Sequence, residues 1–501
     1  MPFALETAKN PEKLKRVAIE PVSRVEGHGK VTILLDDDNH VEQVRLHIVE
    51  FRGFEKFIEG RPYWEVPVMV QRLCGICPVS HHLAASKALD QIVGATLTPT
   101  AEKIRRLMHY GQMLQSHALH FFHLSSPDLL FGFGSDVATR NIVGVIAAAP
   151  EVAKKGVLLR KYGQEVIRMT SGKRVHGTGS VPGGVNKSLS AEERAALQKE
   201  IYTMVAWSRE AVQIIKGLFE KNLAEYNSFG RFTAHSMGLV RADGAMDLYH
   251  GGLRARRSDG STLFDHVDYS RYWDVITEDV KSWSYMKFPF FNAMKNSDEG
   301  WYRVGPLTRV NNCDFIPTPL ADKERQEFKA FDNGSATGAT LGYHWARMIE
   351  MLHAAEAIKD LLHDDDIVGK ELMATGQRQE RGVGVIEAPR GTLIHHYRVD
   401  ENDQVTRANL IVSTTHNNQA MNEAIRVVAK QYLDGKELTE GLLNHIEVAI
   451  RCFDPCLSCA THALGQMPLE VELVGADGTA IDRMTRNMHG VCDRPLSTEL
   501  D

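Results

Sequence analysis

The 501-residue sequence predicts a mixed α and β fold that is mainly α, with long central helices and smaller peripheral β-sheets. Hydrophobic residues make up 43% of the chain and charged residues 24%, which is typical of a folded globular protein. Several long stretches repeat their apolar residues with the period of a helix, whereas shorter stretches alternate apolar and polar residues as half-buried strands do. A chain of this length can bury one large core or several packed subdomains.

Two regions carry the strand pattern. Between residues 17 and 50, apolar and polar residues alternate at Lys30–Leu35 and Val44–Ile48, on either side of an acidic turn at Asp36–Asn39. This pattern predicts a β-hairpin or meander within a β-rich part at about residues 17–60. Strand-like alternation returns at 383–398 and 405–413.

Helices are predicted over most of the remaining chain. Pro78 suits the first turn of a helix that continues through VSHHLAASKALDQIV. Ser190 and Glu193 form a capping-box pattern, which marks a helix start. The other predicted helices run from Thr98–Pro99 to about Leu124, from the capping box at Ser190 to about Ala224, over residues 340–362 and over residues 440–451.

Charge and hydropathy exclude some classes of function. Lys and Arg number 58 against 64 Asp and Glu, a net charge of -6, and no cationic stripe is present to follow a nucleic-acid backbone. The sequence has no run of about 18 apolar residues, the length that a transmembrane helix needs. The opening MPFALETAKNPEKLKRVAIEP lacks the apolar centre of a signal peptide, so we expect a cytoplasmic protein.

The cysteines are unevenly placed. Four of the seven form two C-x-x-C pairs, Cys74 with Cys77 and Cys456 with Cys459. Such a pair can be a redox dithiol, half of a zinc site or half of another metal site. Four thiolates brought together by folding would select nickel, iron or zinc over hard cations. Spacing alone leaves a metal site, a zinc staple and unrelated buried cysteines open. The remaining cysteines are Cys313 and Cys452, expected to be plain buried residues, and Cys492.

The residues around both pairs narrow this choice. RLCGICPVSHH and DPCLSCATH resemble the paired signatures of [NiFe]-hydrogenase large subunits. PVSRVEGHGKV, FRGFEKF, EAPRG at 387–391 and LIVSTTHNN at 410–418 resemble further blocks of that family, in its order, over residues 21–462. VEFRGFEKF, EAPRGTLIHHYR and DPCLSCATHALGQMPLE look most like the cytoplasmic, bidirectional, NAD-reducing type. The resemblance implies a large-subunit fold, with residues 1–462 as the catalytic unit.

The resemblance also implies a nickel–iron centre and its chemistry. All four paired cysteines would bind nickel, and Cys77 and Cys459 would bridge to an iron that carries one CO and two CN⁻ ligands. The implied reaction is the reversible heterolytic cleavage of H2 into protons and electrons. Cys456 would take the proton, and Glu26 would carry it away as a general acid–base group.

Further site residues are implied in the same way. Arg390 would lie over the metals and Asp454 would pair with it. Thr414 would hydrogen-bond a cyanide, Pro389 would form the pocket wall, and His81 would donate to a bridging thiolate.

The sequence departs from the family pattern at one position. Many respiratory members carry an aspartate that aligns with Ser116, so we expect different electrostatics around Arg390. The same stretch is rich in histidines, for which we expect packing and interface roles: His109, His117, His120 and His123.

A magnesium site and a removable tail are also implied. Glu55, the backbone carbonyl near Leu410 and the His462 side chain would hold Mg²⁺, which prefers oxygen ligands. Residues 463–501 would be a maturation propeptide that a dedicated protease cuts after His462. Nickel-insertion and C-terminal processing proteins would therefore be partners.

Electrons need further partners, because the sequence has no G-x-G-x-x-G fingerprint and no additional cysteine cluster for iron–sulfur centres. The resemblance implies an iron–sulfur small subunit, together with diaphorase subunits that carry FMN and bind NAD. The alternatives are an NADP-linked or H2-sensing hydrogenase, a non-catalytic scaffold like that of respiratory complex I, and a zinc-stapled structural subunit. The scaffold would lack the metal cysteines, which are present here.

Overall fold

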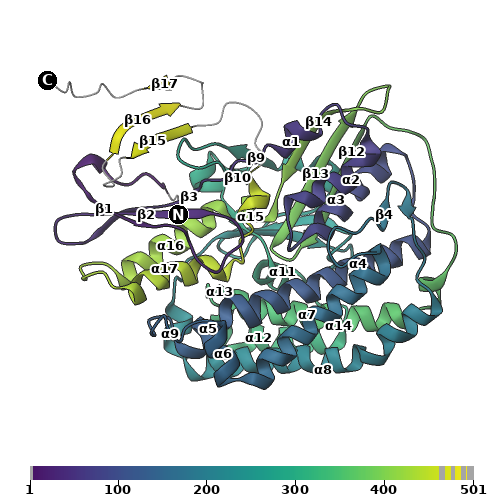
Figure 1. Ribbon diagram of the computed structural model, residues 1–501, viewed down its shortest axis with the longest axis horizontal. Helices are drawn as coiled ribbons and strands as arrows, with labels where there is room; N and C mark the ends of the chain where they lie inside the picture. The colour runs from purple at the N-terminus through teal and green to yellow at the C-terminus, as the bar shows by residue number, and fades with distance from the viewer. Residues whose placement is uncertain (1–3, 462–468, 475–479, 487–491, 494–501) are drawn as a thin grey trace.

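The long helices pack together in the lower part of the view in Figure 1, and the small sheets lie above them and to their left. The computed structural model describes residues 4–461, 469–474, 480–486 and 492–493, the last three segments by their backbone alone. The longer helices are α3 (Pro78–Ile92), α4 (Pro99–Leu119), α7 (Pro150–Ser171), α8 (Ala191–Lys221), α12 (Pro319–Ala330), α14 (Gly342–His363), α16 (Asn418–Tyr432) and α17 (Glu440–Cys452). The shorter helices are α1 (Phe54–Ile58), α2 (Val66–Met69), α5 (Ser126–Phe131), α6 (Ile142–Ala148), α9 (Leu223–Ser228), α10 (Ser297–Gly300), α11 (Pro306–Asn312), α13 (Ser335–Gly338) and α15 (Ser413–His416).

The sheets are mostly antiparallel and short. Their orders are β1-β2-β3, β11-β6-β7-β8, β12-β13-β14 and β15-β16-β17, with two-stranded pairs β10-β9 and β4-β5. The bounds are β1 (Lys15–Ile19), β2 (Gly29–Leu35), β3 (Val41–Ile48), β4 (Ser180–Val181), β5 (Gly184–Val185), β6 (His235–Val240), β7 (Gly252–Arg256), β8 (Thr262–Val267), β9 (Ile276–Asp279), β10 (Phe288–Phe291), β11 (Tyr302–Arg303), β12 (Arg381–Ala388), β13 (Gly391–Val399), β14 (Val405–Ile411), β15 (Leu469–Val474), β16 (Ala480–Arg486) and β17 (Cys492–Asp493).

The helical layer is built around α4. This helix packs against α7 on one side and α14 on another, and α14 also packs against α8 (Figure 1). Two glycines allow the close crossing of α4 and α7. A Cβ on Gly163 would lie 2.6 Å from the carbonyl oxygen of Gly111, nearer than any ordinary contact. The crossing therefore depends on the absence of a side chain at this point.

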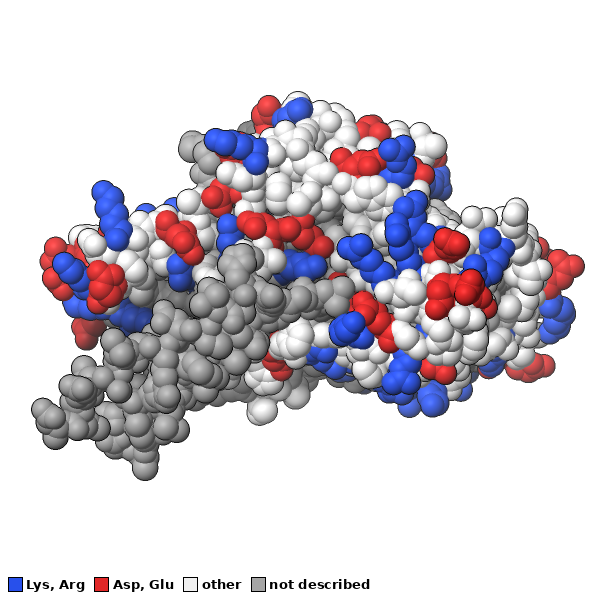
Figure 2. Space-filling view, turned by 90° about the horizontal axis from the view of Figure 1, so that it is seen from above, with Lys and Arg blue, Asp and Glu red and all other residues white. Residues whose placement is uncertain are grey.

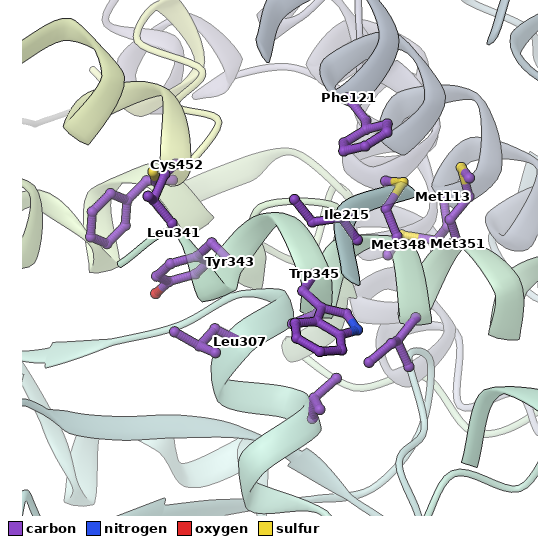
Figure 3. Close-up of a cluster of buried hydrophobic side chains, with 14 of the residues drawn as sticks. Met113, Phe121, Ile215, Leu307, Leu341, Tyr343, Trp345, Met348, Met351 and Cys452 are labelled. Carbon is purple, nitrogen blue, oxygen red and sulfur yellow. The ribbon is translucent and has the colours of Figure 1, made fainter. Parts of the chain in front are cut away.

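Helix α14 lies in the middle of the hydrophobic core. Figure 3 shows its Tyr343, Trp345, Met348 and Met351 among apolar side chains from neighbouring elements. Each of these four side chains is fully buried. Nearly every residue of α14 is buried, so this helix is surrounded by protein on all of its faces.

Most of the predicted elements are confirmed. The N-terminal meander is the sheet β1-β2-β3, and the helix predicted from Pro78 is α3. The capping box forms between Ser190 and Glu193, although α8 ends at Lys221, three residues before the predicted end. The 383–398 segment is two strands, because β12 and β13 meet at a tight turn of Pro389 and Arg390.

No helix in the described part of the chain has both the length and the apolar character needed to cross a bilayer. Acidic and basic side chains are interspersed on the face seen in Figure 2. The mainly helical architecture with small surrounding sheets agrees with the predicted fold class.

Candidate metal centre

Folding brings the two cysteine pairs together. Cys74 follows a single 3-10 turn, and Cys77 is the N-cap residue of α3. Cys456 and Cys459 lie in the irregular segment after α17. Their four Sγ atoms lie within 4.8 Å of one another, and all four residues are buried. In the described part of the chain, this is the single group of three or more His, Cys, Asp or Glu residues with ligand atoms close enough for one ion.

The sulfur atoms are in contact. Cys456 Sγ and Cys459 Sγ are in direct contact, and Cys74 Sγ lies 3.4 Å from Cys456 Sγ. Metal binding requires both members of the Cys456–Cys459 pair as thiolates, hence in the reduced form. Burial alone would raise the pKa of Cys74, but the hydrogen bond from Cys77 and the charge of Arg390 outweigh burial and lower it. This environment favours a thiolate at Cys74.

Glu26 lies beside the second pair. Its backbone forms a bridge with Cys456, and its carbonyl accepts a hydrogen bond of 2.9 Å from the Leu457 N–H. The approach needs a glycine next in sequence, because a Cβ on Gly27 would lie 2.6 Å from Ser458 N. Glu26 Oε2 is 3.0 Å from Cys456 Sγ, and the Ser458 hydroxyl donates to Oε1. Glu26 as a whole is partly exposed, so the residue lies between a buried sulfur and the surface.

Arg390 lies in the turn between β12 and β13. Its Nε donates to the Asp454 carbonyl at 2.5 Å, and its Nη2 lies 3.2 Å from Asp454 Oδ1. Burial opposes the charge of Arg390, but Asp454, Cys77 and Cys74 raise the pKa of the guanidinium above its ordinary value, so it stays protonated. Nη1 is buried and has no hydrogen-bond partner among the described residues. One donor of this arginine is thus available to a ligand.

A narrow cavity of about 10 Å3 adjoins the cysteines. Thr414 Oγ1 accepts a hydrogen bond of 2.9 Å from the Cys456 N–H, which leaves its own hydroxyl hydrogen free to donate. A soft thiolate set beside a cavity with two available donors fits an iron that carries small diatomic ligands. The cavity is lined by Cys77, Ser80, His81, Ala388, Pro389, Arg390, Leu393, Val412, Ser413, Thr414 and Cys456.

His81 is held by a chain of hydrogen bonds. Its Nδ1 lies 3.2 Å from His395 Nε2, and His395 Nδ1 lies 2.6 Å from the Tyr397 hydroxyl. Burial and the charge of Arg390 lower the pKa of His81 to about 3, so the ring is neutral. With Nδ1 engaged, Nε2 is the atom that could reach a thiolate in the shared cavity.

Two of the three predicted magnesium ligands lie together. Glu55 Oε1 accepts a hydrogen bond of 2.8 Å from the Leu410 N–H, and both residues are buried. Carboxylate and backbone carbonyl oxygens are ligands that Mg²⁺ prefers, and the contact seen between these two residues is through the Leu410 N–H. The third predicted ligand, His462, lies outside the described residues.

Residues of α4 and of the turn that follows it contact the segments around the cysteines. Ser116 lies one helical turn after Gln112 and one turn before His120. Gln112 Nε2 donates a hydrogen bond of 2.9 Å to the Ile76 carbonyl, and His120 Nε2 lies 3.9 Å from Asp454 Oδ1. Ser116 therefore lies on the helix face that borders the centre, and its buried hydroxyl has no partner among the described residues. Elsewhere on α4, His117 pairs with Glu350 at 2.8 Å.

Some contacting residues were not predicted. Ser458, which holds the Glu26 carboxylate, is a small polar residue with no distinguishing sequence signal. Arg347 donates to the Cys452 carbonyl at 2.8 Å from the middle of α14, where the pattern indicates only a helix. Cys313 and Cys452 are buried as expected, and burial raises their pKa values to about 11 and about 12.

Four buried cysteines whose sulfur atoms converge form the donor set of a protein that binds a soft metal ion. A family described as "Nickel-dependent hydrogenase" matches residues 52–131 and 249–462, and one described as "HoxL-like" matches residues 16–51. The chain belongs to the nickel-dependent hydrogenase family. It is a hydrogenase large subunit, which makes it an oxidoreductase.

Individual relatives match this chain over nearly its whole length. The chain is 49% identical to the NAD-reducing hydrogenase HoxS subunit beta of Cupriavidus necator, over 94% of this chain and 100% of that protein. It is 42% identical to a chain of the F420-non-reducing hydrogenase of Methanothermobacter thermautotrophicus, over 94% and 100% of the two chains. A solved NAD+-reducing [NiFe]-hydrogenase matches with a TM-score of 0.88 and 59% identity, over 89% of this chain and 99% of that one.

Proposed function

We propose that this chain is the H2-activating subunit of a [NiFe] hydrogenase that passes electrons to NAD through partner subunits. The observation that carries the proposal is the buried four-cysteine cluster with Glu26 Oε2 3.0 Å from Cys456 Sγ. When bound, a nickel–iron centre with CO and CN⁻ ligands would supply the heterolytic cleavage of H2.

The residues of the chain have separate roles in this proposal. Cys74, Cys77, Cys456 and Cys459 would hold the metals, and Cys77 and Cys459 would be the two ligands shared by nickel and iron. Cys456 Sγ holds the proton from H2, and Glu26 accepts it at Oε2, the carboxylate oxygen within hydrogen-bond distance of this sulfur. Glu26, which as a residue is partly exposed, can then release the proton towards the surface.

Other residues orient the centre. Arg390 offers its Nη1 donor to a cyanide, and Asp454 fixes the guanidinium by accepting from Nε and Nη2. Thr414 donates its hydroxyl hydrogen to the second cyanide, and Pro389 closes the wall of the cavity. His81 donates from Nε2 to a bridging thiolate.

We also propose a magnesium ion held by Glu55, the Leu410 carbonyl and His462, and a propeptide at residues 463–501. The alternative is an ordinary C-terminal strand, which the alternation in LEVELV also permits, and this stretch forms β15. Nickel-insertion and processing proteins would act before the final chain ends at His462.

The electron route requires other chains. The described part of this chain holds one candidate metal cluster, so electrons must leave to an iron–sulfur small subunit. The 49% identical relative is named as NAD-reducing, which supports NAD as the final acceptor through a flavin-bearing partner, and such a complex would work in the cytoplasm.

Infrared spectroscopy of the complex purified from its native host tests the proposal. Discrete bands in the CO and CN⁻ stretching region, together with H2-dependent reduction of NAD, are expected. A zinc-containing protein without these bands would contradict the hydrogenase centre. Bands with reduction of NADP but not NAD would contradict the proposed acceptor alone.

A further inference from the structure

A buried ion cluster lies behind the turn that carries Arg390. At its centre is Arg309 of α11, whose side chain has no exposed surface. Arg309 Nε is 2.7 Å from Glu350 Oε2, and Arg309 Nη1 is 2.7 Å from Glu387 Oε2. A buried charge is stable only when it is paired and its hydrogen bonds are satisfied, so the two carboxylates hold Arg309 in one geometry.

The same guanidinium reaches the turn itself. Arg309 Nη1 donates to the Ala388 carbonyl at 3.0 Å, and Nη2 lies 3.4 Å from the Pro389 carbonyl. Thr392 closes the arrangement from the other strand, because its hydroxyl donates to Glu387 Oε1 at 2.8 Å. Residues on both sides of the turn are thus tied to one arginine.

The Pro389–Arg390 turn also has little room to move away from Arg309. A Cβ added to Gly305, the residue before α11, would lie 2.8 Å from the Arg390 carbonyl oxygen. The Ser413 hydroxyl donates to the Gly391 carbonyl at 2.7 Å. The backbone that carries the Arg390 side chain is therefore held from both of its faces.

Helix α14 links this cluster to the segment of the second cysteine pair. Its Glu350 binds Arg309, and its Arg347, one turn away, donates to the Cys452 carbonyl at 2.8 Å. Cys452 lies two residues before Asp454, the partner of Arg390. One rigid helix thus sets the position of Arg390 relative to Asp454.

We propose that Arg309 is a positioning residue of the hydrogenase centre, which fixes the Pro389–Arg390 turn so that the Arg390 guanidinium points into the cavity. This inference rests on the proposed function. Arg309 is not among the described residues that line the cavity, and it acts only through the backbone of the turn. An arginine is required, since only its planar fork of five donors can serve two carboxylates and two carbonyls together.

The test compares two variants of the matured complex, Arg309→Lys and the milder Thr392→Val. Lysine keeps the charge but cannot reach all four acceptors, so the turn and Arg390 shift. We expect the CO and CN⁻ infrared bands to shift, and turnover to fall about tenfold to hundredfold with little change in KM for H2, because small misplacements cost rate. Thr392→Val should move the same bands in the same direction by less.

Arg105→Lys is the matched control. Arg105 is equally buried, forms an ion pair with Asp90 at 2.6 Å, and donates to the Val181 and Gly184 carbonyls. Asp90 lies on α3 roughly 20 Å of helix from Cys77, by the rise per residue of an α-helix. This variant should lower the thermal unfolding temperature and leave the infrared bands in place.

The outcomes separate the two proposals. Wild-type protein without CO and CN⁻ bands would remove the proposed function, and this inference with it. Wild-type bands that remain unshifted in Arg309→Lys would overturn the positioning role alone. If Arg309→Lys does not assemble, Thr392→Val decides: shifted bands support the role, and unshifted bands overturn it.

Discussion

Glu26 and Cys456 form the most direct chemical contact of the site. The carboxylate is held by two donors of Ser458, its hydroxyl at Oε1 and its N–H at 3.2 Å from Oε2. A carboxylate fixed in this way stays within hydrogen-bond distance of the sulfur without needing to search for it. General acid–base catalysis depends on this kind of fixed geometry.

Replacement of Glu26 by glutamine should stop proton removal while the metal centre stays intact. Glutamine keeps the size of the side chain but cannot bind and release a proton, so turnover should fall about a hundredfold or more. H2-driven NAD reduction and the infrared bands are measured on the same sample. Glu50→Gln, at an acidic residue that pairs with His28, is the control. Full activity of Glu26→Gln would assign the relay to another group.

Replacement of Cys456 by serine should abolish hydrogen turnover and lower the nickel content. A hydroxyl is a harder and far less acidic ligand than a thiol, so the site loses one of its four soft donors. Metal analysis of the purified complex and H2 oxidation are the measurements. Cys313→Ala, a buried cysteine outside the cluster, should keep both. Retained turnover in Cys456→Ser would refute the ligand role.

At this scale the sequence predicts the ligands better than their supports. The two C-x-x-C pairs and their flanking residues are local patterns, so Cys74, Cys77, Cys456 and Cys459 could be found directly. Ser458 and Arg309 could not be predicted, since each acts through contacts with segments far away in the chain. In the sequence by itself, Glu26 resembles an ordinary turn residue, and its contact with Cys456 is visible only in the folded structure.

Among the elements, the crossing of α4 and α7 depends on small residues. Gly163 and Gly111 face one another, and a Cβ on Gly111 would lie 2.8 Å from a Val166 methyl carbon. Helix α4 also carries Gln112 and Gln115, which donate to the Ile76 carbonyl between the first two cysteines. The depth of the crossing therefore helps to set the position of the cysteine loop.

Gly163→Ala should push α4 and α7 apart and destabilise the protein by about 1–3 kcal/mol, as overpacking does. Gly217→Ala is the control, since a Cβ there meets nothing within 4 Å. That substitution should instead stabilise α8 by about 0.5–1 kcal/mol, because alanine favours a helix more than glycine does. Thermal unfolding of both variants is the measurement, and equal shifts would contradict the packing argument.

The turn at Pro389–Arg390 shows where pattern analysis of elements fails. Strand-like residues continue on both sides of the turn, and buried positions follow one another through Ala388 and Gly391. Pro389 and Gly391 are residue types that mark chain reversals, but in a turn of two residues there is no polar loop to interrupt the strand pattern, so the sequence predicts 383–398 as one segment. The bounds of α3 and α17, by contrast, follow from Pro78 and from the apolar period of residues 440–451.

At the scale of the whole molecule, many histidines are held neutral inside the fold. Burial is the main cause that lowers their pKa values from 6.5 to about 4 or about 3. Since the unfolded chain binds these protons near pH 6.5, it holds more protons than the folded chain below that pH. The residues are His47, His82, His109, His117, His353 and His416.

The free energy of unfolding should therefore fall as the pH decreases from 6.5 towards 4, by about 1.4 kcal/mol per pH unit for each such histidine. Denaturant unfolding at pH 7, 6 and 5 measures the slope. His353→Gln, which cannot titrate, should reduce the slope by one histidine's share. Equal stability at pH 7 and pH 5 would contradict the neutral assignment.

The mature chain should end at His462 if residues 463–501 are a propeptide. Intact mass spectrometry of active, metal-loaded complex measures this directly. Protein from cells deprived of nickel is the control and should retain the tail, because processing is expected to follow metal insertion. An active species that still contains Cys492 would contradict the propeptide.

Glu26 and Cys456 lie 430 positions apart, yet their backbones pair directly. During synthesis on the ribosome, the carboxylate and the first cysteine pair emerge early, and the second pair emerges only near the end of translation. A nascent chain of intermediate length can therefore present two of the cysteines but never the complete pocket. The four-cysteine cluster can therefore form only after almost the whole chain has been made.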